Sequence, residues 1–223
     1  DVATAALVET VYLNGLGEFA YRNGLNLRGR FRLPVEGEAF AAPTLGLREH
    51  ALVAIGGGKD SLVSIEALRS LGIEETVTWI GGSQLIRACA ERTGLPILNI
   101  GRTLAPELFE LNRQGAWNGH IPVTAVNSAI MVLAALLQGV DQVVFSNERS
   151  ASYGSQIPGT GEVNHQWSKG WAFEQAFGEH LEQHVAADLH YYSLLRVSSP
   201  RAISTTRISP AATATSTSWA SAR

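Results

Sequence analysis

The feature that most constrains this chain is a strand-like apolar run that stops at three consecutive glycines. Residues 52–55 are Leu-Val-Ala-Ile, residues 56–58 are glycine, and residues 59–61 are Lys-Asp-Ser, where a helical pattern begins. Glycines let a backbone approach an anion closely. The start of a helix directs unpaired N–H groups and a partial positive charge at the same point. The order strand, glycine loop, helix therefore predicts a loop that binds phosphate.

Three kinds of phosphate loop compete for this segment. A Walker loop requires glycine where Val53 stands and a hydroxyl residue where Asp60 stands. A dinucleotide fingerprint requires glycine where Ser61 stands and an acidic residue after the next strand. Residues 57–61 match the pyrophosphate loop (PP-loop) of ATP pyrophosphatases, Ser-Gly-Gly-x-Asp-Ser, with Gly56 at the leading serine position. Such enzymes cleave ATP between the α- and β-phosphates; a glycine-rich turn without a ligand is the alternative.

Strands alternate with helices from about residue 50 onward. The expected strands cover residues 52–55, 76–80, 96–100 and 141–145, and the expected helices cover residues 61–71, 84–93 and 123–137. This alternation predicts right-handed crossovers and a parallel sheet. The predicted fold class is α/β and Rossmann-like, of the adenine nucleotide alpha-hydrolase or PP-loop ATP pyrophosphatase type. Ligands of such sheets bind at the carboxyl ends of the strands.

The chain divides into three segments by composition. Residues 1–45 carry an apolar helical stripe and a short strand-like stretch, and we expect them to belong to a larger domain. Residues 46–196 form the predicted nucleotide-binding domain. Residues 197–223 consist mostly of Ser, Thr, Ala, Arg and Pro. Such a composition predicts a disordered or foreign tail, because it cannot bury enough apolar area to offset the cost of ordering.

Charge and cysteine content exclude several classes of function. The formal net charge is -3, with no block of like charge, which argues against a dedicated nucleic-acid binder. Cys89 is the only cysteine, so a disulfide or a two-thiol racemase within one chain is excluded. No apolar run reaches the length of a membrane span, and the N-terminus does not resemble a signal peptide. We therefore expect a cytoplasmic protein without a membrane partner; the sequence does not indicate its oligomeric state.

Other polar positions have a structural and a functional interpretation. Thr124 is a candidate N-cap of the long helix, with Asn127 three residues later. His180 and His184 lie four residues apart on a helix, as metal ligands can, but no third well-placed ligand accompanies them.

Four polar motifs in this order resemble one family. They are the glycine loop, Asn-Gly-His-Ile-Pro-Val-Thr-Ala at residues 118–125, the segment 146–152 after the fourth strand, and Asn-His-Gln-Trp-Ser-Lys at residues 164–169. Together they resemble the UDP-N-acetylmuramoyl-L-alanyl-L-glutamate epimerases of bacterial peptidoglycan synthesis, over roughly residues 8–196. The resemblance implies that ATP and Mg²⁺ serve to convert the terminal L-Glu of UDP-MurNAc-L-Ala-L-Glu to D-Glu through an acyl-adenylate. Family members are longer at both ends, and the segment after Arg196 does not look like the expected continuation.

The resemblance also implies roles for particular residues. Proton transfer at the glutamate α-carbon needs a base on one face and an acid on the other. The expected acid and base groups are His120 and His165, with Glu148 next. The expected nucleotide-binding residues are Gly56, Gly57, Gly58, Lys59, Asp60 and Ser61. Mg²⁺ is expected on Asp60, alone or with Glu148, and the substrate or the leaving pyrophosphate on Asn147, Arg149, Asn164 and Lys169.

Two other classes of function share the loop. Another ATP pyrophosphatase, such as an amide ligase or a tRNA-modifying enzyme, would have the same fold, although the chain lacks a CxxC pair and a basic stripe. A non-catalytic ATP-binding module would also fit. A nicotinamide-dependent oxidoreductase is disfavoured by the missing fingerprint glycine and ribose-binding acid.

Overall fold

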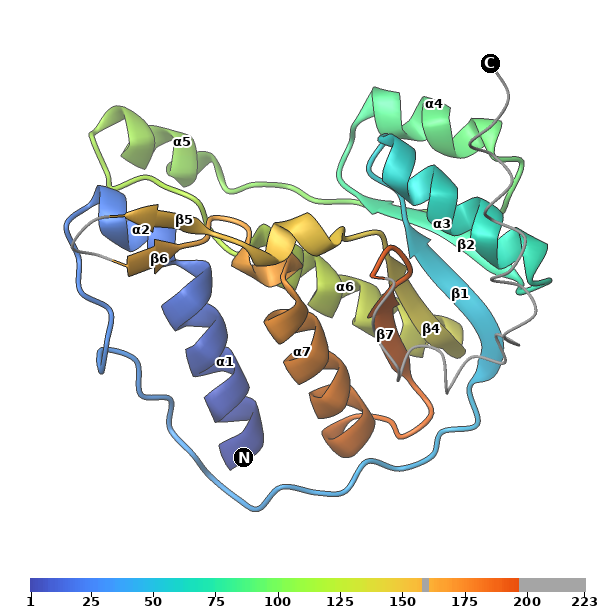
Figure 1. Ribbon diagram of the computed structural model, residues 1–223, viewed down its shortest axis with the longest axis horizontal. Helices are drawn as coiled ribbons and strands as arrows, with labels where there is room; N and C mark the ends of the chain where they lie inside the picture. The colour runs from blue at the N-terminus through green and yellow to red at the C-terminus, as the bar shows by residue number, and fades with distance from the viewer. Residues whose placement is uncertain (158–160, 197–223) are drawn as a thin grey trace.

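A five-stranded parallel sheet forms the centre of the molecule (Figure 1). The computed structural model describes residues 1–157 and 161–196 of the 223-residue chain. The strand order is β3-β2-β1-β4-β7, and every neighbouring pair is parallel. The strands are β1 (Arg48–Ala54), β2 (Glu75–Ile80), β3 (Ile97–Ile100), β4 (Val140–Phe145) and β7 (His190–Ser193). The predicted α/β class with a parallel sheet is confirmed.

Helices cover both faces of this sheet, because the central strands are apolar on both sides. On one face, Val53 of β1 packs in a core with residues of α3 (Lys59–Ser70) and α4 (Gln84–Arg92). On the other face, Leu52 packs in a second core with residues of α6 (Val123–Gln138) and α7 (Trp171–His184). The strand order reverses between β1 and β4, because β2 and β3 lie on one side of β1 and β4 and β7 on the other. Open α/β sheets bind ligands at such a switch point.

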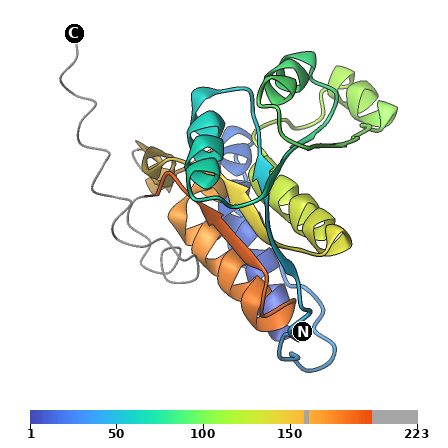
Figure 2. The same cartoon turned by 90° about the vertical axis from the view of Figure 1, so that its right-hand side faces the viewer.

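The N-terminal segment packs onto the side of this domain. The helical stripe expected within residues 1–45 forms two helices, α1 (Val2–Gly15) and α2 (Gly17–Arg22), separated at Leu16. The strand-like stretch expected in residues 1–45 is wrong, because residues 24–47 contain turns and irregular backbone only. Helix α1 lies beside α7 in both views (Figure 1, Figure 2) and also contacts the short helix η2 (Trp167–Lys169).

Several elements are not apparent in the sequence pattern. They are α5 (Pro106–Arg113), the 3-10 helix η1 (Arg149–Ser152), the edge strand β7, and an antiparallel hairpin of β5 (Ser155–Ile157) and β6 (Gly161–Val163). The predicted tail over residues 197–223 lies outside the described residues. Among the helices that the structure describes, none combines the length and the apolar character needed to span a membrane.

Candidate functional site

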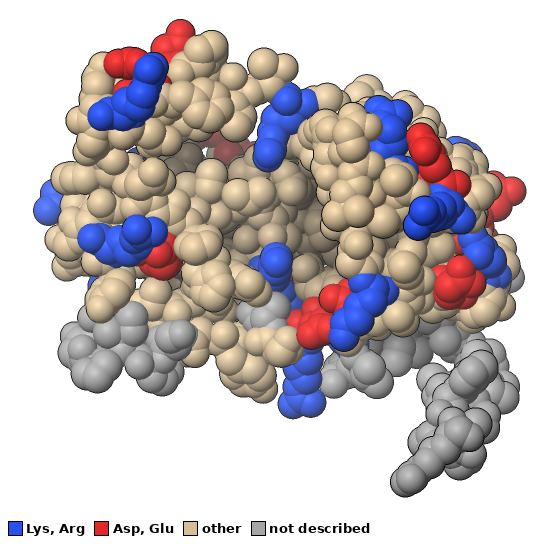
Figure 3. All heavy atoms as spheres, turned by 90° about the horizontal axis from the view of Figure 1, so that it is seen from above, with Lys and Arg blue, Asp and Glu red and all other residues tan. Residues whose placement is uncertain are grey.

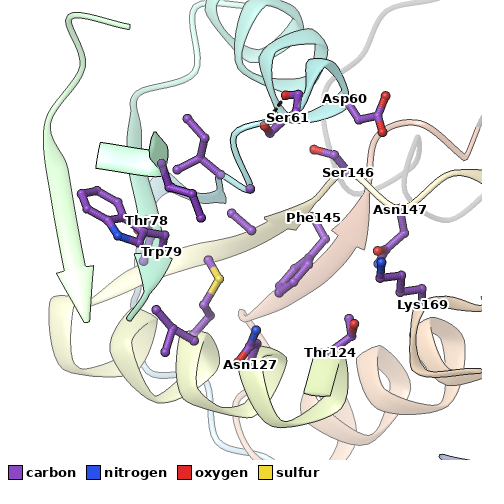
Figure 4. A pocket seen from close by; sticks show the side chains of 17 residues that line it. Asp60, Ser61, Thr78, Trp79, Thr124, Asn127, Phe145, Ser146, Asn147 and Lys169 are labelled. Atoms are coloured by element: carbon purple, nitrogen blue, oxygen red, sulfur yellow. Dashed lines mark hydrogen bonds between the residues drawn. The ribbon is translucent and has the colours of Figure 1, made fainter. Parts of the chain in front are cut away.

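A cavity of about 390 Å³ lies at the carboxyl edge of the sheet, beside the glycine loop (Figure 4). Seen from above, the molecule is hollowed near its centre, and basic side chains stand at the edge of the hollow (Figure 3). The cavity is lined by the ends of β1, β2 and β4, by the start of α3, by one side of α6, and by Lys169. Its position agrees with the ligand-binding edge expected for a parallel sheet.

The glycine loop brings backbone N–H groups to this cavity. Gly57 has φ +79°, a conformation that side chains rarely adopt, and the loop turns there into α3. Gly58 caps the helix with extended backbone, and no side chain caps the first N–H groups of α3. A Cβ at Gly56 or Gly58 would meet no atom within 4 Å, so the backbone is open at these two positions. Unpaired N–H groups at the start of a helix form a site for an anion.

Three buried polar atoms on the cavity wall have no hydrogen-bond partner in the described part of the chain. They are Thr78 Oγ1, Trp79 Nε1 and Asn127 Oδ1. Thr78 is 0% exposed and Trp79 is 4% exposed. Buried polar atoms are almost always paired, because an unpaired one loses its hydrogen bonds to water. A ligand that offers both donors and acceptors would supply what these atoms lack.

The loop after β4 is tied to two neighbouring elements. Ser146 Oγ donates to Ser64 Oγ of α3 at 2.7 Å, and Asn147 Nδ2 donates to Ser193 Oγ of β7 at 3.2 Å. Ser146 and Asn147 line the cavity. Glu148 and Arg149 are exposed and are not among the lining residues. The loop therefore turns away from the cavity after Asn147.

Lys169 reaches the cavity from η2, which an internal ion pair holds in place. Arg196 donates to the Lys169 carbonyl, to Ser152 Oγ at 3.0 Å and to Glu174 Oε2 at 2.9 Å. Burial raises the pKa of Glu174, against the opposing effect of hydrogen bonds from Ser193 and Arg196. One arginine thus joins α7, η1 and η2 behind the cavity.

His120 and His165 come together although they are far apart in the sequence. Their ring centroids are 5.1 Å apart and the ring planes are inclined by 54°. Glu18 of α2 meets His120, with Oε2 accepting from the backbone N–H at 2.6 Å and lying 3.2 Å from Nδ1. Burial opposes ionisation of Glu18, but the hydrogen bonds from His120 outweigh it and hold the pKa of Glu18 below its usual range.

A second cavity of about 570 Å³ lies on the other side of η2. Trp167 and Gly170 line this second cavity, whereas Lys169 lines the first. Asn164, expected at the substrate, also lines the second cavity, together with Arg28. Asn147 and Lys169 therefore line one hollow and Asn164 another, whereas His120 and His165 are not among the residues that line either.

Carboxylates and histidines in the described residues form no cluster of three or more that could hold a metal ion. Asp60 is the one carboxylate among the described residues that line the first cavity. His180 and His184 have ring centroids 5.0 Å apart, and His180 Nε2 lies 3.3 Å from Thr4 Oγ1. Burial lowers the pKa of His180, and neighbouring His184 adds to that shift.

A comparison with protein families shows to which family the chain belongs. Residues 1–194 match the model described as "MurL N-terminal domain". The chain belongs to the MurL family.

Curated relatives of this MurL-family chain carry one name. Proteins named UDP-N-acetyl-alpha-D-muramoyl-L-alanyl-L-glutamate epimerase match from Xanthomonas oryzae pv. oryzae, at 81% identity over 204 residues, and from Salinispora tropica, at 45% identity over 198 residues. A third relative of that name, from a Micromonospora species, is 44% identical over 198 residues. The matches cover 91%, 87% and 87% of this chain but 45%, 43% and 44% of the relatives. The chain thus spans slightly less than half the length of these relatives.

In this MurL-family chain, sequence reasoning missed part of the cavity wall. Thr124 is not the N-cap of α6; Pro122 precedes the helix, and Thr124 stands in its first turn facing the cavity. Asn127, one turn further along, lines the same wall. Thr78 and Trp79 were also missed, although their place near the carboxyl end of the second strand was a usable signal. Among the predicted residues, those lining the first cavity are Gly56, Gly58, Asp60, Ser61, Asn147 and Lys169.

Proposed function

We propose that this chain is the ATP-binding and adenylating part of an epimerase that converts the terminal L-Glu of UDP-MurNAc-L-Ala-L-Glu to D-Glu. The observation that carries the proposal is the cavity at the glycine loop, where open backbone N–H groups stand beside three unpaired buried polar atoms of the described residues. The names of the relatives supply the substrate. The fold is then of the PP-loop ATP pyrophosphatase type.

ATP would fit this cavity with its triphosphate at the glycine loop and its base at the apolar wall. The triphosphate would lie on residues 56–61, with Lys59 and Lys169 balancing its charge. The base would lie against the apolar wall that includes Trp79, Ile86 and Met131. Adenine presents both an amino donor and ring-nitrogen acceptors. These groups match a wall on which the described residues offer an indole N–H, a hydroxyl and an amide oxygen without partners.

Mg²⁺ fits the carboxylate present at the loop. Mg²⁺ on nucleotides is usually held by one or two protein carboxylates together with phosphate oxygens and water. Asp60 lines the cavity from the first turn of α3 and would be that ligand. The ion would supply positive charge for the leaving pyrophosphate. Glu148 stands one residue beyond the lining residue Asn147 and would serve as a second ligand only if its loop turned inward.

The reaction would proceed in four steps. An oxygen of the glutamate α-carboxylate attacks the α-phosphorus of ATP, and the bond to the bridging oxygen of the β-phosphate breaks, releasing pyrophosphate. The carboxylate charge is then masked, so the carbonyl can accept the electron pair left when a base removes the α-proton. A proton returns on the opposite face, and water attacks the acyl carbon to release AMP and D-Glu.

The histidine pair limits how the two proton transfers can be arranged. Ring centroids 5.1 Å apart leave no room for a substrate carbon between His120 and His165. The two rings would therefore act together from one face of the α-carbon, as the base or as the acid. The second group would come from another element, with Glu148 as the candidate in this chain.

The proposal is tested with the chain itself in D₂O, using ATP, Mg²⁺ and UDP-MurNAc-L-Ala-L-Glu. Pyrophosphate release with deuterium at the glutamate α-carbon supports the epimerase. Release without deuterium would point to a ligase-type pyrophosphatase. ATP binding without release would leave a binding module and would refute the proposed catalysis.

Two variants make that experiment specific. Asp60→Asn should abolish pyrophosphate release while circular dichroism stays unchanged, because it removes the proposed metal ligand. Glu107→Gln, an exposed carboxylate in the first turn of α5, is the matched control and should release pyrophosphate at the original rate. Equal rates for both variants would remove Asp60 from the mechanism.

A further inference from the structure

We propose that Glu18 is a positioning residue that fixes the tautomer of His120, and so makes His120 and His165 one proton-transfer unit. This role rests on the proposed epimerase function, but the hydrogen-bond arrangement behind it can be tested without nucleotide. Glu18 lies in the N-terminal segment, outside the four polar motifs, and no pattern in the sequence pointed to it.

One carboxylate oxygen meets two atoms of the same histidine. Glu18 Oε2 accepts the backbone N–H of His120 at 2.6 Å and lies 3.2 Å from ring Nδ1. The other oxygen, Oε1, lies 3.6 Å from Arg22 Nη1. The Glu18 side chain is 19% exposed, whereas that of His120 is 57% exposed. The carboxylate is thus held beneath an imidazole that remains open to solvent.

This contact determines which nitrogen of His120 carries the proton. A neutral imidazole has one N–H donor and one acceptor nitrogen, and the partner of one nitrogen decides the state of the other. An ionised carboxylate only accepts, so Glu18 Oε2 at 3.2 Å favours the tautomer of neutral His120 that carries its hydrogen on Nδ1. Nε2 of neutral His120 then keeps its lone pair and can accept a proton. The same arrangement orients metal-binding histidines through a carboxylate behind the ring.

Close packing around the contact prevents the histidine loop from moving away. Asn23 Nδ2 donates to the Asn118 carbonyl at 3.1 Å, which joins the end of α2 to the residue before Gly119. A Cβ at Gly119 would lie 2.7 Å from Phe19 Cα, and a Cβ at Gly15 would lie 2.5 Å from Pro122 Cβ. The loop therefore touches the α1–α2 segment on both sides of His120.

The two histidines of the pair differ in their contacts with carboxylates. Two adjacent imidazoles do not readily both take a proton, because like charges repel. Within the part of the chain that the structure describes, a carboxylate forms an ion pair with His120 and none does so with His165. His120 is thereby the oriented ring, and exposed His165 is the neighbour with which it can share a proton.

The tautomer is measured by nitrogen-15 NMR of the histidine rings in the nucleotide-free chain. The Nδ1–H and Nε2–H forms of a neutral imidazole have distinct shifts, and spectra are recorded at about pH 9, above the ordinary pKa of imidazole. We expect His120 in the Nδ1–H form. His190 is an internal reference, because its Nδ1 lies 3.1 Å from Glu182 Oε1, far from Glu18 in the fold. A wild-type His120 in the Nε2–H form would overturn the proposal without any variant.

Variants separate positioning from simple structural support. Glu18→Ala and Glu18→Gln should each weaken the Nδ1–H preference of His120 and leave His190 unchanged. Glu9→Gln removes an equal charge from α1, where its carboxylate accepts from the Leu33 N–H, and should leave His120 as it is. An unchanged His120 in the folded Glu18→Ala variant would contradict the inference.

A kinetic measurement tests the consequence for the reaction. Adenylation would take place in the cavity of the glycine loop, whereas the proton transfer would use the histidine pair. Glu18→Gln should therefore retain pyrophosphate release but lower deuterium incorporation about 10–100-fold, the usual effect of losing a group behind a reactive one. Equal loss of both signals would show that Glu18 only supports the fold.

Discussion

Arg196 Nε donates to Glu174 Oε2 at 2.9 Å, and both side chains are only 5% exposed. The same guanidinium reaches Ser152 Oγ and the carbonyl of Lys169, which are on the two short helices beside the cavity. The pair thus connects the interior of α7 to the element that presents Lys169. The two buried charges of Glu174 and Arg196 are tolerated there because the fold supplies hydrogen-bond partners for both groups.

Breaking this pair should be costly. Arg196→Met leaves the Glu174 carboxylate buried beside apolar atoms, and we expect the free energy of unfolding to fall by about 3–5 kcal/mol. Urea denaturation measures the change. The double variant Glu174→Met/Arg196→Met should recover most of the loss, because no buried charge remains. Arg113→Met breaks an exposed pair with Glu110 and should cost less than about 1 kcal/mol.

The unpaired hydroxyl of Thr78 predicts opposite effects on stability and on nucleotide binding. Thr78→Val removes a fully buried hydroxyl without a described partner, so the nucleotide-free protein should gain about 1 kcal/mol. If ATP supplies the missing partner, its affinity should fall about 5–10-fold in the same variant. Thermal unfolding and calorimetric titration with ATP measure the two effects. A loss of stability with unchanged ATP affinity would contradict both expectations.

Glu75 predicts a loss of stability as the pH rises. Burial raises the pKa of Glu75 to about 7, only partly offset by Arg69. Glu75 is 4% exposed, and both of its carboxylate oxygens lack a partner in the described part of the chain. The folded state holds the proton more tightly than the unfolded chain, so stability is complete below about pH 4.5 and declines up to about pH 7.

The variant Glu75→Gln isolates that contribution. It should be more stable than the wild type at about pH 8, by roughly 2–3 kcal/mol, and similar to it at about pH 4.5. Chemical denaturation across this range gives the comparison. Parallel pH profiles for the two proteins would show that Glu75 ionises without cost.

The close approach of Gly119 to α2 predicts a steric effect at the histidine pair. A Cβ at Gly119 would lie 2.7 Å from the backbone atom Cα of Phe19, so Gly119→Ala must displace the loop. We expect a loss of about 1–3 kcal/mol and a shift of the His120 ring signals in NMR spectra. Gly101→Ala, where a Cβ would meet nothing within 4 Å, is the matched control. Unchanged His120 signals in the Gly119 variant would contradict this close packing of the loop against α2.

Much of the sheet could be predicted because local pattern and tertiary environment agree. Strands β1, β2 and β4 each contain a short apolar or β-branched stretch, at residues 51–54, 76–80 and 143–145, since both of their faces are covered. Glycines at residues 72, 94 and 139 mark where the intervening helices end, and all three have positive φ. The edge strand β7 was missed, because His-Tyr-Tyr-Ser is short and has no apolar run; it becomes a strand only through pairing with β4.

The candidate site was predicted in part, where the local sequence sets the backbone conformation. The loop at residues 56–61 carries its conformation in its glycines, and it lies at the cavity as expected. Nothing in the sequence around Asn127 indicates that it lines a cavity. An asparagine inside a helical pattern can face solvent or a ligand, and only the packing of the helix decides which. Lys59, Glu148 and Arg149 keep their predicted roles as proposals, although they are not among the residues lining the cavity.

The sequence alone determined the alternation of strands and helices, the glycine loop between β1 and α3, and the family to which the motifs point. These properties depend on neighbouring residues and on the conformations that glycine permits. Tertiary structure decided which distant side chains meet: Glu18 with His120, His120 with His165, and Arg196 with Glu174. Such contacts form when whole helices pack on a common core. The sequence pattern of one segment does not reveal which distant segment will pack against it.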